Sequence, residues 1–281
     1  MTRSLLTFND MKKVLFILAI MTLATSAFAQ KAERNDSIPK NNWGAKLKES
    51  NFHLCLDLQT KYIWRGVEMM TENSAPVLFP GIFYSNKGFY VYMLGGYAIN
   101  GKWSCITYGI SYTYKWFTVG VNDYYYPTTT SPIDQYFNYK PRETGHLLEA
   151  VVTIAPEKVP IYLIVSNFFY GADRYIVTDS DGNIVTDSDG NLKVKQAYST
   201  YAELGTYYDF LNAHRLSLAL GAAFNKSCYN GYQKGFSICN IELKYTYNLA
   251  IKDFTLPLSA MFIYNPVCNK AHVNFQASFV F

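Results

Sequence analysis

The end of the chain carries its clearest pattern. From Val273 onward, apolar side chains alternate with small or polar ones, and the last residue is Phe281. A period of two predicts a β-strand with one apolar and one polar face. A terminal strand of this kind, in a chain that begins with an export signal, is typical of the closing strand of an outer-membrane β-barrel. We expect this strand to be the part that the barrel-assembly machinery contacts.

The longest alternation covers residues 52–65. Its apolar face carries Phe52, Leu54, Leu56, Leu58, Tyr62 and Trp64. Its polar face carries His53, Cys55, Asp57, Gln59, Lys61 and Arg65. A half-buried strand of a soluble sandwich also alternates, but rarely for so long. A tilted strand crosses a bilayer in about 9–11 residues, so this segment is long enough to span one.

Similar segments fill the rest of the chain. They lie at 76–85, 88–99, 103–114, 116–126, 146–155, 160–170, 197–208, 214–225, 236–248, 254–264 and 271–281. The pattern therefore predicts an all-β fold, a transmembrane antiparallel up-and-down β-barrel of about twelve strands that occupies residues 51–281.

The connections between these segments alternate in length. Short ones lie at 86–87, near 115, at 156–159, at 211–213 and around 252. Long ones lie at 66–75, 127–145, 171–196, 226–235 and 265–270, and only the Asn100-Gly101 turn on their side is tight. Short turns at one end and long loops at the other are characteristic of bacterial outer-membrane barrels, with the short turns in the periplasm.

The first 29 residues are predicted to be a signal peptide. Lys12 and Lys13 precede a short apolar run at 14–23, and Ala27-Phe28-Ala29 supplies a cleavage site, so the mature chain is expected to begin at Gln30. A complete signal starts at Met11, which suggests a mis-annotated start. A membrane helix is the weaker alternative, because the run is about half the ~20 residues needed. Residues 30–50 are polar and predict a periplasmic lead-in.

Composition agrees with an outer-membrane location in a Gram-negative bacterium. Aromatic residues make up 17% of the chain and 25 residues are Tyr, whose ring suits the boundary between membrane and water. We expect an aromatic girdle to include Trp64, Tyr124, Tyr126 and Phe281. The net charge of +4 comes without a basic stripe, so a nucleic-acid partner is not expected. The expected partners are the lipid bilayer and small solutes.

Alternation places charges of both signs in the lumen. The candidates are His53, Asp57, Lys61, Arg65, Glu149, Glu203, Arg215, Glu242 and Lys244. They suit either a charged constriction that selects solutes or a network of paired charges in a filled interior. Barrels of about eight strands are filled by side chains and those of about sixteen leave a channel. For twelve strands we expect a narrow channel in preference to a plugged barrel.

An outer-membrane lipid hydrolase is the competing enzyme class. Such an enzyme needs a nucleophilic Ser within reach of a His. None of the four His is followed by Ser two residues later, and there is no Gly-x-Ser-x-Gly motif. His146 and His272 are expected near the outer rim, where Asn274 shares a face with His272. We therefore expect no enzyme, no catalytic residue and no cofactor.

Two further features bear on ligands. Cys228 and Cys268 fall in predicted loops on the same side, so they could form a bridge, or all five Cys could be free thiols. No Cys or His spacing suggests a metal. The loop at 177–192 repeats Val-Thr-Asp-Ser-Asp-Gly-Asn, which looks like half of a calcium loop. Ile184 stands where that loop needs Gly, however, so structural turns are the preferred interpretation.

Several short motifs resemble one family. They are Lys61-Tyr62-Ile63-Trp64-Arg65-Gly66 with Pro76 ten residues on, the segment 119–127, Leu148-Glu149-Ala150 and Ala202-Glu203-Leu204. Together these are similar to the TorF-like family of outer-membrane porins, which has no firmly assigned substrate. The resemblance implies an outer-membrane barrel with a suspected pore and implies no catalytic residues. The tandem repeat and the Cys residues are not part of that pattern.

These observations lead to an expected function. A barrel of this size with a charged lumen predicts passive diffusion of small solutes, selected by lumen size and charge. The alternative is a non-conducting outer-membrane barrel that anchors a partner or exposes adhesive loops.

Overall fold

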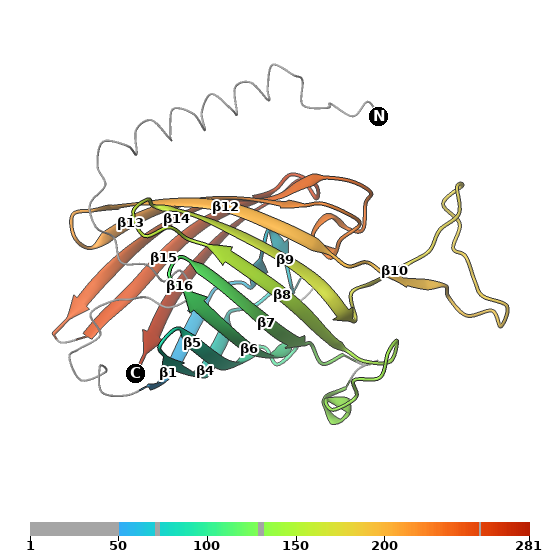
Figure 1. The fold of residues 1–281 in the computed structure, drawn as a ribbon, viewed down its shortest axis with the longest axis horizontal. Helices are drawn as coiled ribbons and strands as arrows, with labels where there is room; N and C mark the ends of the chain where they lie inside the picture. The colour runs from blue at the N-terminus through green and yellow to red at the C-terminus, as the bar shows by residue number, and fades with distance from the viewer. Residues whose placement is uncertain (1–50, 71–73, 129–131, 253) are drawn as a thin grey trace, which may run out of the picture.

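The computed structural model describes residues 51–281 except 71–73, 129–131 and 253, so the predicted signal peptide and the 30–50 lead-in lie outside the described residues. Twelve antiparallel strands pair in one closed barrel (Figure 1). They are β1 (Phe52–Gln59), β4 (Val77–Asn86), β5 (Phe89–Ala98), β6 (Ser104–Tyr114), β7 (Phe117–Tyr125), β8 (His146–Ile154), β9 (Ile161–Gly171), β12 (Thr200–Phe210), β13 (His214–Ala223), β14 (Ser237–Ile251), β15 (Phe254–Asn265) and β16 (Lys270–Val280). The predicted all-β barrel is confirmed.

The last strand closes the barrel against the first. β16 pairs with β1 from Cys55 opposite Val280 to Gln59 opposite Gln276. At the end of this seam, the Leu54 and Phe281 backbones exchange hydrogen bonds of 3.1 and 2.8 Å. Closure leaves no unpaired sheet edge, which a barrel in a membrane requires.

The alternation along each strand puts apolar side chains on the outside. On β6, Tyr108, Ile110 and Tyr112 are 38%, 48% and 50% exposed, whereas Thr107 between two outward neighbours is buried. Large apolar side chains are exposed in the same way on strands all round the wall. A continuous apolar exterior of this kind fits a transmembrane barrel, whose solvent is lipid.

Most connections sort by length as the sequence predicts, but the one between β15 and β16, predicted to be long, is only residues 266–269. One end, called here the short-turn end, has tight reversals at Lys87, Lys115, Leu211-Asn212 and Lys252, all with positive φ. The other end, called the long-loop end, carries the connections 60–76, 126–145, 172–199 and 224–236. Figure 1 shows the connection between β9 and β12 projecting far from the barrel, with β10 (Arg174–Ile176) at its base.

Few helical turns occur in the loops. The short 3₁₀ turns η2 (Ile133–Gln135) and η3 (Cys228–Asn230) both lie in connections at the long-loop end. Among the residues that the structure describes, no helix has the length and hydropathy that a membrane-crossing helix needs.

The buried aromatic residues gather inside the long-loop half. One cluster contains Tyr124, Phe168, Tyr201 and Tyr229, with Trp64 packed against it. A second contains Met70, Val77, Phe79, Ala98 and Cys105, with Tyr62 and Trp103 packed against it. Both clusters include residues of the connection between β1 and β4, so its residues 62–70 lie within the barrel.

Candidate functional site

A hairpin that folds into the lumen is the main feature of the interior. β2 (Ile63–Trp64) and β3 (Val67–Glu68) pair across a turn at Arg65 and Gly66, whose φ values are 50° and 80°. The Met69 amide donates to the Tyr62 carbonyl over 3.0 Å at its base. We call residues 62–70 the inward hairpin.

The first strand therefore ends earlier than alternation predicts. β1 stops at Gln59, not at Arg65. The Thr60 amide still donates to Phe275 on β16, but the Lys61 amide donates to the side chain of Asn274, which points inward. From there the chain leaves the wall, and Tyr62 and Trp64 become interior residues.

The hairpin tip packs closely against the wall strands β14 and β15. A Cβ added at Gly66 would lie 2.0 Å from the Cys239 carbonyl oxygen on β14. The Gly66 carbonyl accepts a hydrogen bond of 3.0 Å from Asn265 on β15. Only glycine fits at this position, because both the positive φ and the close backbone exclude a side chain.

The Arg65 side chain at the hairpin tip is largely buried between the hairpin and the barrel wall. Its guanidinium donates to the Glu149 carboxylate on β8 and to the Tyr229 hydroxyl over 2.6 Å. It also lies 4.8 Å from the ring centroids of both Trp64 and Tyr201. Cation–π contacts and charge-assisted hydrogen bonds together offset the cost of burying this cation.

Glu149 is fully buried and receives donors from the wall as well. The Tyr124 hydroxyl donates to it over 2.7 Å and the Asn122 amide over 3.4 Å. A carboxylate with three donor groups around it has its lone pairs satisfied, so the Arg65–Glu149 pair is a built interior contact. It joins the hairpin tip to β7 and β8.

Three of the four predicted girdle residues lie elsewhere. Trp64 packs its ring 5.3 Å from that of Tyr124, and Tyr126 lies 6.2 Å from Trp103 inside the barrel. The prediction was wrong for these three because the inward hairpin supplies an aromatic surface in the lumen. Phe281 differs, since it is 57% exposed at the short-turn end.

The opposite flank of the hairpin packs on the second aromatic cluster. The Tyr62 ring lies 4.9 Å from Phe79 and 5.2 Å from Trp103, measured between centroids. Contacts on both flanks mean that the hairpin crosses the lumen. The long-loop half therefore holds a plug where the sequence predicts a narrow channel.

The short-turn half of the lumen is lined differently. The candidates Asp57, Glu242 and Lys244 are partly accessible on the inward faces of their strands. His53 stacks on Phe83 with centroids 4.9 Å apart. Arg215 forms a two-pronged pair with Asp209, at 2.6 and 2.9 Å. Accessible charges of both signs here contrast with the buried Arg65–Glu149 pair in the long-loop half.

The remaining lumen candidates join the interior network. Glu203 accepts from the hydroxyls of Tyr201 and Tyr162 and from the Asn240 amide. Lys61 lies 3.8 Å from Glu68 on the hairpin, and the other oxygen of Glu68 lies 3.8 Å from His272. Arg65, Glu149 and Glu203 thus belong to the interior network, with Arg65 on the hairpin and not on the wall, whereas Lys61 and Arg215 are partly exposed.

Tyr229 and Asn265 are interior residues that the sequence analysis missed. Tyr229 sits in η3, within a long connection, yet it is 1% exposed and contacts Arg65. Alternation has no bearing on a loop, so it gives no signal there. Ser227 caps η3 by accepting from the Tyr229 amide. A Ser in a loop is too common to predict such a turn from the sequence.

Within the described residues, His146 is the one of the four His that has a carboxylate oxygen at hydrogen-bond distance, and its ring is enclosed by acceptors. His146 lies under the loop at 132–145, with Nδ1 2.8 Å from Asp123 and Nε2 against the Tyr136 carbonyl. Tyr139 donates to the other oxygen of Asp123. Both ring nitrogens face acceptors within the protein, so neither is directed at a nucleophile in this structure.

Other expected ligand sites resolve as local structure. All five Cys are free thiols, so Cys228 and Cys268 form no bridge. Asp179 accepts from the amides of Asp181 and Asn183, and Asp187 repeats this with its own turn. These carboxylates hold turns, and within the described residues no group of three metal-ligating side chains comes together.

No family model matches the chain, and no curated protein sequence matches it. Its fold is similar to that of the KdgM porin, at 8% identity and a TM-score of 0.43 over 82% of this chain and 98% of the porin. The NanC porin gives 10% identity and a TM-score of 0.42, over 81% and 98%. An outer membrane channel from Pseudomonas putida F1 is 12% identical, with a TM-score of 0.37 over 82% of this chain and 94% of the channel. Likeness at this level carries no conclusion about function.

Proposed function

We propose that the protein is a porin-like channel of the Gram-negative outer membrane, closed in this conformation by the inward hairpin. Small solutes would pass through the lumen by diffusion, selected by its size and charge. The observation that carries the proposal is that a separate segment, residues 62–70, fills the long-loop half. A barrel that needed only rigidity could fill its interior with wall side chains.

The short-turn half supports the same proposal. Asp57, Glu242 and Lys244 are partly accessible on the inward faces of β1 and β14, and we infer that they would form a charged vestibule beneath the hairpin. Release of the hairpin would connect this vestibule with the other side of the membrane. The charges of the vestibule would then act on each passing ion.

A non-conducting barrel that anchors a partner or displays loops is the second candidate. The buried Arg65–Glu149 ion pair favours it, because release of the hairpin would separate that pair. A lipid hydrolase is not favoured, since neither ring nitrogen of His146 is directed at a nucleophile. Conductance separates the two remaining candidates.

Gly66→Ala tests the proposal in planar bilayers. The added methyl group meets the Cys239 carbonyl, so the variant is expected to expel the hairpin and to raise single-channel conductance several-fold above wild type. Gly101→Ala is the matched control: its φ is 71°, it also lies at the long-loop end, and nothing approaches its Cβ. Its conductance is expected to equal that of wild type. A folded Gly66→Ala barrel that stays silent would favour the anchor.

A further inference from the structure

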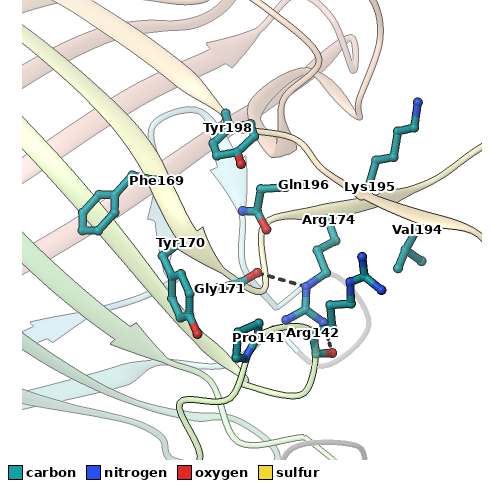
Figure 2. Close-up of a pocket in the computed structure, with 10 residues that line it drawn as sticks. All are labelled: Pro141, Arg142, Phe169, Tyr170, Gly171, Arg174, Val194, Lys195, Gln196 and Tyr198. Carbon is teal, nitrogen blue, oxygen red and sulfur yellow. Dashed lines mark hydrogen bonds between the residues drawn. The ribbon is translucent and has the colours of Figure 1, made fainter.

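A cleft on the outside of the barrel has the chemistry of an anion site. It encloses about 510 Å³ at the long-loop end, between β9, the 141–142 segment and the ribbon of β10 with β11 (Val194–Gln196) (Figure 2). Arg142 and Arg174 both line it (Figure 2), and their like charges interact. Lys195 stands at the rim with its ammonium pointing away from them.

The position of Arg174 is held by backbone carbonyls and not by an acid. It donates to the carbonyl oxygens of Gly171 at 3.0 Å, Thr144 at 3.2 Å and Arg142. Partial burial, and then the like charge of Arg142, hold the pKa of Arg174 below its ordinary value. Two cations held together without a counterion form an electrostatic site for an anion.

The acids nearest in sequence have other partners. Glu143 lies 3.8 Å from Lys140, and Asp173 accepts from the amide and hydroxyl of Ser199 over 2.7 Å. Within the residues that the structure describes, no carboxylate pairs with Arg142 or Arg174. The positive charge of the cleft is therefore not neutralised by the protein.

A hydrogen-bond donor in the same cleft also has no acceptor. Gln196 stands directly opposite Arg174 in the ribbon and lines the cleft. Its amide nitrogen is buried and makes no hydrogen bond within the described part of the chain. A buried donor of this kind is costly, and an anion that reached the cleft floor would supply the acceptor.

The other border of the cleft is apolar and continues down the wall. Phe169 is 43% exposed and follows Val165 and Ile161 on the outward face of β9, which are 39% and 40% exposed. Tyr198, 53% exposed, stands on the same border. The cleft thus joins a cationic pocket to the surface that acyl chains cover in a transmembrane barrel.

We propose that this cleft binds the phosphate of a phosphorylated lipid in the outer leaflet, with its acyl chain along Phe169 and Val165. A headgroup phosphate would reach both guanidinium groups while the lipid stays in the bilayer. A soluble phosphate shares the headgroup chemistry but has nothing to place on the apolar border. The proposal concerns the outside of the barrel and holds whether or not the lumen conducts.

Native mass spectrometry of the full-length mature protein from nanodiscs tests the proposal. With phosphatidic acid in phosphatidylcholine discs, wild type is expected to retain phosphatidic acid selectively. Arg142→Ala is expected to weaken retention about tenfold, because it removes one charged contact. The Arg142 side chain is exposed, and Arg174 donates to its backbone, so the barrel and Arg174 should be unchanged. Lys234→Ala, an exposed cation of another long-loop connection, is the control and should retain the lipid like wild type.

Two results would overturn the proposal. One is equal retention of phosphatidic acid by Arg142→Ala and wild type, which would remove the arginines from the contact. The other is release of the lipid by an excess of inorganic phosphate, which would identify a soluble anion as the ligand. Retention that survives inorganic phosphate and falls in Arg142→Ala supports a lipid site.

Discussion

Arg65 shows how one residue can determine the state of the lumen. Its charge is buried against Glu149, and the rings of Trp64 and Tyr201 lie on it. A buried pair of this kind adds little net stability over apolar packing, but losing one partner strands the other charge. The pair therefore contributes mainly by favouring one position of the hairpin over others.

Arg65→Ala is expected to free the hairpin without unfolding the barrel. Removing one partner of a buried pair costs about 3–5 kcal/mol. We expect this cost to lower the free energy needed to open the hairpin and to leave the folded barrel intact. Hydrogen exchange at the Met69 amide, whose acceptor is the Tyr62 carbonyl, should accelerate correspondingly. Arg215→Ala is the comparison, because its pair is partly exposed and is worth at most about 1 kcal/mol. Unchanged protection of the Met69 amide in Arg65→Ala would show that the Arg65–Glu149 pair does not hold the hairpin in place.

Arg215 is expected to affect ion selectivity and not closure. In a barrel opened by Gly66→Ala, the change Arg215→Ala leaves Asp209 uncompensated at the short-turn mouth. The reversal potential should shift toward cations, whereas Lys158→Ala, an exposed charge in a short turn, should not move it. Equal reversal potentials for Gly66→Ala alone, with Arg215→Ala and with Lys158→Ala would show that the charges that select ions lie elsewhere.

At the scale of elements, the wall could be predicted and the hairpin could not. Alternation reports only that a segment has two unlike faces. Tyr62 and Trp64 continue the period of β1, and a hairpin between aromatic clusters needs the same alternation as a strand between lipid and lumen. Thr60 interrupts the apolar stripe two residues before Tyr62, and Gly66 follows closely. Those two residues are the signal that could have marked the end of β1.

Tertiary contacts decided the rest of the site. Glu149 and Glu203 belong to wall strands, so their inward direction follows from local parity. Tyr229 and Asn265 reach Arg65 and Gly66 through residues distant in sequence, and no local pattern encodes such a meeting. Whether the nine charged candidates line a path for solutes stays a prediction.

The tandem turns of the longest loop are expected to depend on pH. Hydrogen bonds from the backbone amides of Asn183 and Asn191 lower the pKa of Asp179 and Asp187. Their contribution is present above the unfolded-state pKa of about 3.9 and is lost as pH falls through the lowered folded pKa. NMR shifts of the Asn183 and Asn191 amides should therefore change together in that acidic range. Shifts that stay constant to about pH 2 would contradict this description of the turns.

For the molecule as a whole, the wall and the closure are separable. Gln59 on β1 stands opposite Val77 on β4, so these neighbours pair directly where the 60–76 connection begins and ends. A short turn could join them, as short turns join strands at the other end. The barrel would then keep its strand pairs and lose only the segment that crosses its lumen.

Single-channel conductance of a barrel in which Asn-Gly replaces residues 61–75 tests whether the inward hairpin closes a channel. Circular dichroism and heat-modifiable migration on gels would first confirm that the barrel is closed. We expect steady openings with a conductance several-fold above that of the intact chain. A closed, correctly inserted barrel that carries no current after losing the hairpin would contradict the channel and leave an anchoring role.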